Sequence, residues 1–444
     1  MATTEVEDRR NSFPKFAVGS DRSRLETKYQ DIIHEELKFS NVVSYVGNKS
    51  IPLLRLYRFK EAFAFDFVNE FIRRFGLSSK DYIFDPYCGM GTTLFASMLK
   101  KIPSIGIDRL PVATFVSQTI PLFLFARNGE LRTTFEHLKE TVEHVKPASV
   151  AMDVAIMKKA FLDENLLALR KWKAAIDSLP SPMQEVFLLL FLSILESCSF
   201  TSKDGQFLRL NRDKKMFTPK EALARKVEDA EQDLIKIKQF YGIQDLEGIC
   251  LPQVYLGDAR DVSKVPFERS PTAIITSPPY PNRYDYSRSY SLELCFHFVK
   301  NFEELKNIRF SLLRSHIESK IDTAERPPHP SIQEVVELLG KQELNNPRIP
   351  FMLTTYFIDM KKCIEQWSKV LAKNAKVAIV VDNVRYDGEM IPTDLILSEM
   401  AENVGFRVKE IIVCRYKGNS SQQMKKYGRI LMRESVAVWE LDSK

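Results

Sequence analysis

Short apolar runs alternate with apolar residues at helical spacing near the start of the chain. YIFDP (82–86) and SIGIDR (104–109) are short and apolar and end in polar or turn residues, so each predicts a buried strand. GTTLFASMLKK (91–101) predicts a helix between them, and another helix is expected from Phe63 onward within residues 57–75. Strand, glycine-containing turn, helix and strand make up the βαβ unit of a parallel, doubly wound sheet.

The same alternation returns after residue 250. The predicted strands lie at 254–259, 273–279, 376–383, 407–416 and 435–441, and the predicted helices at 352–371 and 392–403. Both parts of the chain therefore belong to one α/β fold with a doubly wound, mostly parallel sheet.

Three regions do not follow this alternation. Helical patterns dominate 110–147, 151–178, 181–200 and 218–240, so the interruption is expected to be a large helical insertion. Residues 300–350 contain PPHP and NNP and predict an irregular, loop-rich stretch. The divisions expected are an N-terminal arm (1–50), a core made of 51–110 and 250–444, and a helical insertion (111–249).

Composition narrows the class of protein. Hydrophobic residues make up 44% of the chain, yet no run approaches the roughly 20 apolar residues of a membrane helix. The polar start MATTEVEDRR is unlike a signal peptide, and six scattered cysteines suit a reducing cytoplasm. No cysteine or histidine spacing matches a metal site, so no metal is expected. A net charge of +6 permits a nucleic-acid partner without requiring one.

The first candidate site is the turn DPYCGMGTT (85–93), which joins a predicted strand to a predicted helix. Gly89 and Gly91 can adopt positive φ and let a ligand approach the backbone closely. Asp108 and Asp258 end two further strands, where one can accept ribose hydroxyls and the other an adenine amino group. Each feature alone is equally compatible with an ordinary turn or helix cap, but together and in this order they favour a nucleoside ligand.

The second candidate site is TSPPY (276–280), which follows an apolar strand. Its two prolines stiffen the backbone and leave the carbonyls of Ser277 and Pro278 as exposed acceptors. Acceptors for both N–H groups of an aromatic amine localise its lone pair and make it a nucleophile. The ring of Tyr280 can stack on an extruded base. A proline-rich turn with a buried tyrosine is the alternative interpretation.

DPYCGMGTT with TSPPY resembles the DNA amino-methyltransferases, which methylate adenine N6 or cytosine N4. The resemblance covers 57–110, 250–295 and 352–441 and extends to bacterial restriction–modification enzymes. It implies a Rossmann-like methyltransferase fold, S-adenosyl-L-methionine as cofactor, and double-stranded DNA as substrate. It implies cofactor contacts from Phe63, Phe65, Asp85, Cys88, Gly89, Gly91, Asp108 and Asp258, and a catalytic motif of Ser277, Pro278, Pro279 and Tyr280.

Serine at the start of the catalytic tetrapeptide is the form usual for cytosine-N4 enzymes, so that activity is predicted. Adenine-N6 methylation, methylation of RNA or of a protein amide, and a non-catalytic nucleic-acid-binding role are the alternatives. The chain departs from the family at Met90, where a small residue is common, and in its long insertion. The resemblance also implies a bacterial, cytoplasmic enzyme whose partner is a restriction endonuclease of the same site specificity, without direct contact.

Basic and polar side chains gather in three segments that suit DNA: 201–215, 281–290 and 415–429. A solvated basic loop or an ordinary hairpin is the alternative for each. The candidate DNA contacts are Lys203, Arg209, Arg212, Lys214, Arg283, Tyr286 and Arg288. The helical insertion is accordingly the candidate target-recognition region.

Overall fold

The computed structural model describes residues 16–204, 207–241, 248–320, 322, 324–417, 425–428 and 430–442. Most of the predicted basic segment 415–429 lies outside these residues, although Arg415, Tyr416 and Lys417 are described.

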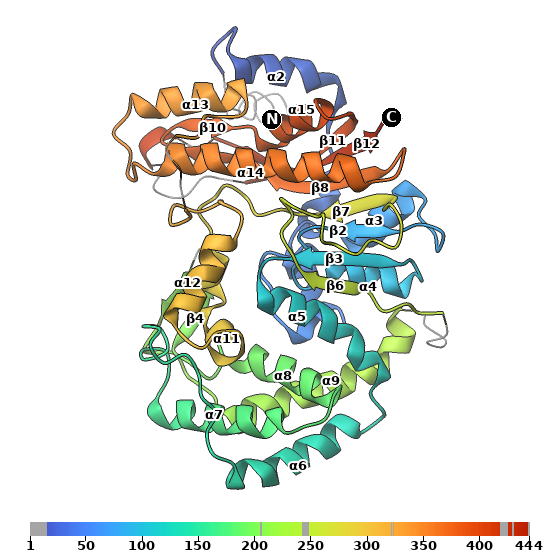
Figure 1. Cartoon of the computed structure of the whole chain (residues 1–444), viewed down its shortest axis with the longest axis vertical. Helices are drawn as coiled ribbons and strands as arrows, with labels where there is room; N and C mark the ends of the chain where they lie inside the picture. Colours follow the sequence, from blue (N-terminus) through green and yellow to red (C-terminus); the bar gives the residue numbers. More distant parts are fainter. Residues whose placement is uncertain are drawn as a thin grey trace, which may run out of the picture.

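An eight-stranded sheet forms the centre of the upper part of the molecule (Figure 1). Its strand order is β1-β11-β12-β8-β7-β2-β3-β6. Within the described sheet β12 runs antiparallel to both neighbours, and the other strand pairs are parallel. The strands are β1 (Ile33–Glu35), β2 (Ile83–Asp85), β3 (Ser104–Asp108), β6 (Gln253–Leu256), β7 (Ala273–Thr276), β8 (Lys376–Asp382), β11 (Phe406–Lys417) and β12 (Met432–Leu441).

Helices cover both faces of the sheet because its central strands are apolar on both sides. In β8, for example, Val377, Ile379 and Val381 join one hydrophobic cluster, whereas Ala378 and Val380 join the other. One face carries α3 (Phe65–Phe75), α4 (Thr92–Leu99) and α5 (Pro111–Thr119), and the other carries α2 (Asp21–Tyr29), α13 (Pro330–Gly340), α14 (Ile349–Val370) and α15 (Thr393–Glu402). The predicted doubly wound α/β fold is confirmed.

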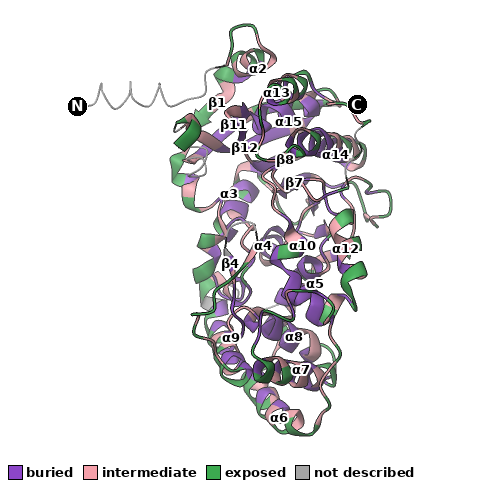
Figure 2. Cartoon of the chain, turned by 90° about the vertical axis from the view of Figure 1, so that its left-hand side faces the viewer, coloured by how far each residue is buried: buried purple, intermediate pink, exposed green. Residues whose placement is uncertain are grey.

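A helical unit extends the first face away from the sheet. Its core is continuous with that of α3, α4 and α5, and Figure 2 shows α5 and α8 as buried. Helix α5 packs on β3 and β6, so the helices that depart from the sheet begin after it. The unit contains α6 (Glu130–His144), α7 (Asp163–Asp177), α8 (Met183–Ile194), α9 (Pro219–Tyr241) and the antiparallel hairpin of β4 (Thr201–Asp204) and β5 (Phe207–Leu210).

Two sequence expectations are wrong in detail. The stretch 300–350 contains two helices, α12 (Phe302–Ser311) and α13, because Asn301 caps the first and Pro330 occupies the first turn of the second. Thr201–Asp204 and Phe207–Leu210 pair as antiparallel strands, where the sequence was expected to form a loop. Part of the predicted N-terminal arm is built into the fold, since β1 adds a parallel strand beside β11 and Arg22 of α2 pairs with Glu334 and Glu389.

The remaining elements of the described residues are short. They are α10 (Tyr286–Ser289), α11 (Ser291–Glu293), the π-helical turn η6 (Leu294–Phe298), the hairpin of β9 (Val384–Tyr386) and β10 (Glu389–Ile391), and the 3₁₀ turns Gln30–Ile32, Leu37–Asn41, Tyr45–Ser50, Leu54–Leu56 and Ile120–Phe125. Throughout the described ranges, no helix combines the length and apolar character that crossing a membrane requires.

Candidate active site

One cavity of about 310 Å³ opens at the carboxyl ends of the parallel strands. This is the edge where ligands bind in open α/β sheets. Of the sequence-predicted residues, Phe63, Cys88, Gly89, Asp108, Asp258, Ser277, Pro278, Pro279, Tyr280 and Tyr286 line it. The two motifs, nearly 200 residues apart, therefore share a single cavity.

The turn after β2, residues 85–93, is called the cradle here. Its two predicted glycines have different roles. Both have positive φ, +52° at Gly89 and +82° at Gly91. Gly89 lines the cavity, and its N–H donates to Asp108 at 3.0 Å. Gly91 lies outside the cavity lining, and a Cβ there would come within 2.7 Å of the Ser117 hydroxyl. Gly91 is thus required by close packing of the turn against α5.

Two acids at strand ends also differ. Asp108 lines the cavity and accepts hydrogen bonds from the N–H groups of Gly89 and Leu110, at 3.0 and 2.9 Å. Burial raises its pKa to about 6, although these hydrogen bonds oppose the rise. Asp85 is fully buried beneath the cavity and accepts from the Thr276 hydroxyl at 2.6 Å. Burial raises the pKa of Asp85 to about 7. Asp85 thus joins two strands, and it does not line the cavity.

The aromatic residues ahead of the cradle point in two directions. Phe63 lines the cavity, whereas Phe65 packs on Phe95 and Tyr241 in the core. Phe59, which the sequence did not single out, lines the cavity beside Gly89 and stacks on Tyr290 with ring centroids 4.8 Å apart. Cys88 lines the cavity as a buried thiol whose pKa is raised by burial.

The turn formed by TSPPY (276–280), the candidate catalytic turn, has two hydroxyl groups, those of Ser277 and Tyr280, that are joined by a chain of hydrogen bonds. The Ser277 hydroxyl lies 3.2 Å from the Val380 carbonyl oxygen and 3.3 Å from the Tyr280 hydroxyl. The Tyr280 hydroxyl donates to Glu434 at 3.3 Å. Since the Ser277 proton is used within the protein, the lone pairs of its oxygen stay available as acceptors.

A charged wall faces this turn, and sequence reasoning missed most of it. The wall consists of Asp382, Arg415, Lys417 and Glu434, all of which line the cavity. Lys417 bonds both Asp382 and Glu434 at 2.9 Å, and Arg415 pairs with Glu434. Burial raises the pKa of Asp382 to about 7; Lys417 opposes the rise and Glu434 adds to it. Only the strand-end position of Asp382 and the basic pattern of 415–429 hinted at this wall.

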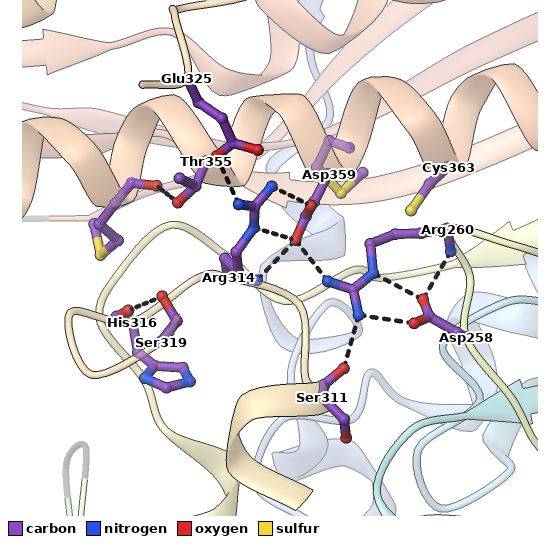
Figure 3. A network of polar contacts seen from close by, with 12 residues as sticks. Asp258, Arg260, Ser311, Arg314, His316, Ser319, Glu325, Thr355, Asp359 and Cys363 are labelled. Carbon is purple, nitrogen blue, oxygen red and sulfur yellow. Dashed lines mark hydrogen bonds and ion pairs between the residues drawn. The ribbon is translucent and has the colours of Figure 1, made fainter. Parts of the chain in front are cut away.

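Asp258, on the opposite side of the cavity, is held by Arg260. The guanidinium donates to its two carboxylate oxygens at 2.9 and 2.7 Å, as Figure 3 shows. Burial pushes the pKa of Asp258 upward, but Arg260 outweighs burial and leaves the pKa below its usual value. The acid therefore presents a charged acceptor in a fixed orientation.

These residues fit S-adenosylmethionine. A charged acid at the end of β3 can accept ribose hydroxyls, and the aromatic face of Phe63 and the Gly89 backbone leave room for a flat, polar ligand. Asp258 offers an acceptor for an amino group. When bound, the cofactor supplies an electrophilic methyl group to the part of the cavity between the cradle and the catalytic turn.

The candidate DNA contacts separate into buried and surface groups. Lys203 is buried, pairs with Glu293, and lies 4.1 Å from the Tyr290 ring centroid, so its ammonium is not on the surface as predicted. Lys214 donates to two backbone carbonyls, and burial lowers its pKa. Arg209, Arg212 and Arg288 are exposed.

The segment after the catalytic turn also divides. Tyr286 lines the cavity, and Tyr284 beside it does so as well, with ring centroids 5.1 Å apart. Arg283 has φ +68°, and its guanidinium lies 6.0 Å from the Tyr386 ring centroid, outside the cavity lining. Exposed Arg288 pairs with Glu318 at 3.0 Å.

Comparison with known proteins follows this geometry. A mostly parallel sheet with one antiparallel strand, helices on both faces and a cavity at the strand ends is the Rossmann-like fold of S-adenosylmethionine-dependent methyltransferases. No model of a protein family matches the chain.

Curated relatives match over nearly its whole length. M.BsoBI of Geobacillus stearothermophilus, a type II methyltransferase, is 31% identical over 97% of this chain and 94% of its own. The type II methyltransferases M.AvaI of Nostoc sp. and Anabaena variabilis are each 32% identical over 98% of this chain and 96% of their own. The chain belongs to the type II methyltransferases, the DNA methyltransferases of restriction–modification systems.

The cradle predicts a pH dependence of cofactor affinity. Asp108 accepts best when ionised, and its pKa is about 6, so affinity should fall as the pH is lowered through this value. Asp108→Asn should weaken binding roughly ten- to a hundredfold at pH 8, since charged acceptors contribute about 1.5–3 kcal/mol per bond. It should also remove this pH dependence. Calorimetric titration with S-adenosylmethionine between about pH 5 and 8 measures both.

Asp261→Asn is the matched control, because Asp261 is an exposed acid near Asp258 and outside the cavity lining. It should leave affinity and its pH profile unchanged. An identical profile in wild type and Asp108→Asn would remove Asp108 from the ribose site.

Proposed function

We propose that this chain transfers a methyl group from S-adenosylmethionine to the exocyclic N4 amino group of cytosine in double-stranded DNA. The observation that carries the proposal is the single cavity shared by Gly89 and Asp108 at one end and by Ser277 and Tyr280 at the other. A base inside a duplex cannot reach such a cavity, so the target must be extruded, at a cost of about a few kcal/mol.

The catalytic turn activates the amine. The carbonyl oxygens of Ser277 and Pro278 and the Ser277 hydroxyl oxygen accept from its two N–H groups, which localises the nitrogen lone pair as the nitrogen becomes tetrahedral. Ser277 can accept because its own proton is directed to Val380 or Tyr280. Tyr280 presents its ring to the base while Glu434 holds its hydroxyl. As the bond from nitrogen to the methyl carbon forms, the sulfur–methyl bond breaks and S-adenosylhomocysteine leaves, and the methylated nitrogen then loses one proton to solvent. Positioning of nitrogen and methyl group supplies most of the rate acceleration.

The charged wall supports cytosine over adenine. Along its Watson–Crick edge cytosine carries two acceptors, N3 and O2, after the reacting amine, whereas adenine carries only N1 on that edge. Lys417 is a donor at this end of the cavity, and its ammonium lies 5.9 Å from the Tyr280 ring centroid. Asp382 becomes a second donor when protonated, near its pKa of about 7. With Ser277 opening the motif, these donors favour the base that has a carbonyl.

The hairpin of β4 and β5 is proposed as a DNA-contacting element. Exposed Arg209 of β5 and exposed Arg212 just after it suit phosphate or base contacts. Buried Lys203 of β4 anchors the hairpin through Glu293, and Lys60, which lines the cavity, donates to the Lys203 carbonyl at 2.9 Å. The hairpin is thereby tied to the cavity that receives the target base. A restriction endonuclease of the same specificity is proposed as the biological partner.

Modification-aware sequencing of DNA from cells that express the chain tests the base and the site together. The expected product is N4-methylcytosine at one short recognition sequence. Mass spectrometry of digested DNA identifies the methylated nucleoside independently. Methyladenine as the only product would contradict the cytosine assignment, and absence of any methylated base would contradict the proposed substrate.

Tyr280 provides a test of the catalytic turn. Tyr280→Ala should reduce activity about ten- to a hundredfold, because a base–aromatic stack contributes about 1–3 kcal/mol. Tyr280→Phe should keep most of the activity, since it loses only the hydroxyl bonds to Ser277 and Glu434 and keeps the ring. Single-turnover rates with the identified site measure both, and cofactor affinity should be unaffected. Equal losses in the two variants would assign the role to the hydroxyl instead of the ring.

The hairpin predicts a change in salt dependence. Replacing Arg209 and Arg212 together by Ala should weaken DNA binding and lower the slope of log affinity against log salt by up to about 2, since each phosphate contact contributes about 0.9. Arg407→Ala is the control, because this exposed arginine lies near the start of β11, at the opposite end of the strand from Arg415 and Lys417 of the cavity lining. An unchanged slope in the double variant would place the hairpin away from DNA.

A further inference from the structure

A buried acid in α14 holds two arginines side by side. Asp359 has a side chain only 2% exposed and accepts from Arg260 at 3.0 Å. It also accepts from the Arg314 guanidinium, at 2.7 and 3.1 Å, and from the Arg314 backbone N–H at 3.2 Å. In Figure 3 the acid lies between the two guanidiniums. Neither motif includes Asp359, yet this residue positions two arginines, Arg260 and Arg314, next to the cavity.

Through Arg260 the acid reaches the cofactor end. Arg260 uses one nitrogen on Asp359 and two on Asp258, and it also donates to the Ser311 carbonyl at 2.8 Å. A bidentate pair fixes both distance and plane of the carboxylate. The orientation of Asp258 therefore depends on where Asp359 places the guanidinium.

Through Arg314 the same acid reaches the other end. Arg314 belongs to the segment that follows α12, in which Ser311, Leu312 and Leu313 line the cavity. The carbonyl of Ser315 in this segment accepts from the N–H of Arg283, three residues after Tyr280, at 3.0 Å. Placement of the segment thus also bears on the chain that leaves the catalytic turn.

The charges alternate along this network. Asp258, Arg260, Asp359, Arg314 and Glu325 follow one another, with Arg314 bonded to Glu325 at 2.6 Å. Without the Asp359 carboxylate, two poorly exposed guanidiniums would face each other with no anion between them. Removing one partner from a buried charged set leaves the others uncompensated. Arg260 would then lose the contact that fixes the plane of its guanidinium, and with it the fixed direction in which it holds Asp258.

We propose that Asp359 is a positioning residue for methyl transfer, which orients Asp258 toward the adenine amino group of the cofactor and holds the 311–315 segment against the cavity. The part concerning the target base rests on the proposed function, but the part concerning the cofactor does not.

The test compares two ligands by calorimetry: S-adenosylhomocysteine and S-inosylhomocysteine, in which a carbonyl replaces the adenine amino group. The wild-type chain should bind the adenosyl ligand at least about tenfold more tightly, since an unpaired buried acceptor disfavours the inosyl ligand. Asp359→Asn should weaken the adenosyl ligand about ten- to a hundredfold and reduce the preference toward one. A loss of fold alone would weaken both ligands equally.

Two further variants keep the outcome decisive. Arg260→Lys keeps the charge but loses the bidentate geometry, so it should also lose the preference. Asp233→Asn is the matched control, because Asp233 is a buried acid paired with Arg55 outside the cavity lining; it should lower the melting temperature and keep the preference. No preference in the wild type, or a preference retained in Asp359→Asn and Arg260→Lys, would overturn the proposal. Since no DNA is present, methyladenine as the enzymatic product would contradict only the proposed function.

Discussion

The site depends on one buried hydrogen bond between neighbouring strands. Thr276, the last residue of β7, donates to Asp85, the last residue of β2, at 2.6 Å, and the two strands run parallel. The bond fixes both strand ends at the same height, so the cradle after β2 and the catalytic turn after β7 open into one space. The acid is costly to bury, as its raised pKa shows, and it is kept where the two motifs must be aligned.

Ion pairs fix the positions of the charged side chains around the rest of the cavity. Arg260 pairs with Asp258. Glu434 pairs with both Lys417 and Arg415, and Lys203 of the hairpin pairs with Glu293. Such pairs add little net stability, because each charge loses its hydration. Their value lies in fixed geometry: the acceptors at both ends of the cavity point in set directions before any ligand arrives.

Sequence alone predicted the sheet and the two motifs, because buried strands and strand-end turns have strong local patterns. It placed Gly91 and Asp85 at the cofactor, where the structure assigns them to packing and to strand alignment, since composition cannot distinguish a contact with ligand from one with protein. It treated Lys203 as a surface cation because its partner, Glu293, lies 90 residues away. Asp359 belongs to no recognisable motif, and its role becomes visible only from its contacts with Arg260 and Arg314 in the folded chain.

The position of β12 has a consequence for biosynthesis. This strand inserts between β8 and β11 although it follows both of them in the chain, and it brings Glu434 to the cavity. Strand β1 is synthesised before the other described strands of the sheet. It can pair with β11 only after nearly 400 further residues have been added. A ribosome adding about 5–20 residues per second therefore releases every cradle residue well before the pocket wall exists. A chain that ended before β12 would therefore keep both motifs and lack Glu434 of the cavity lining.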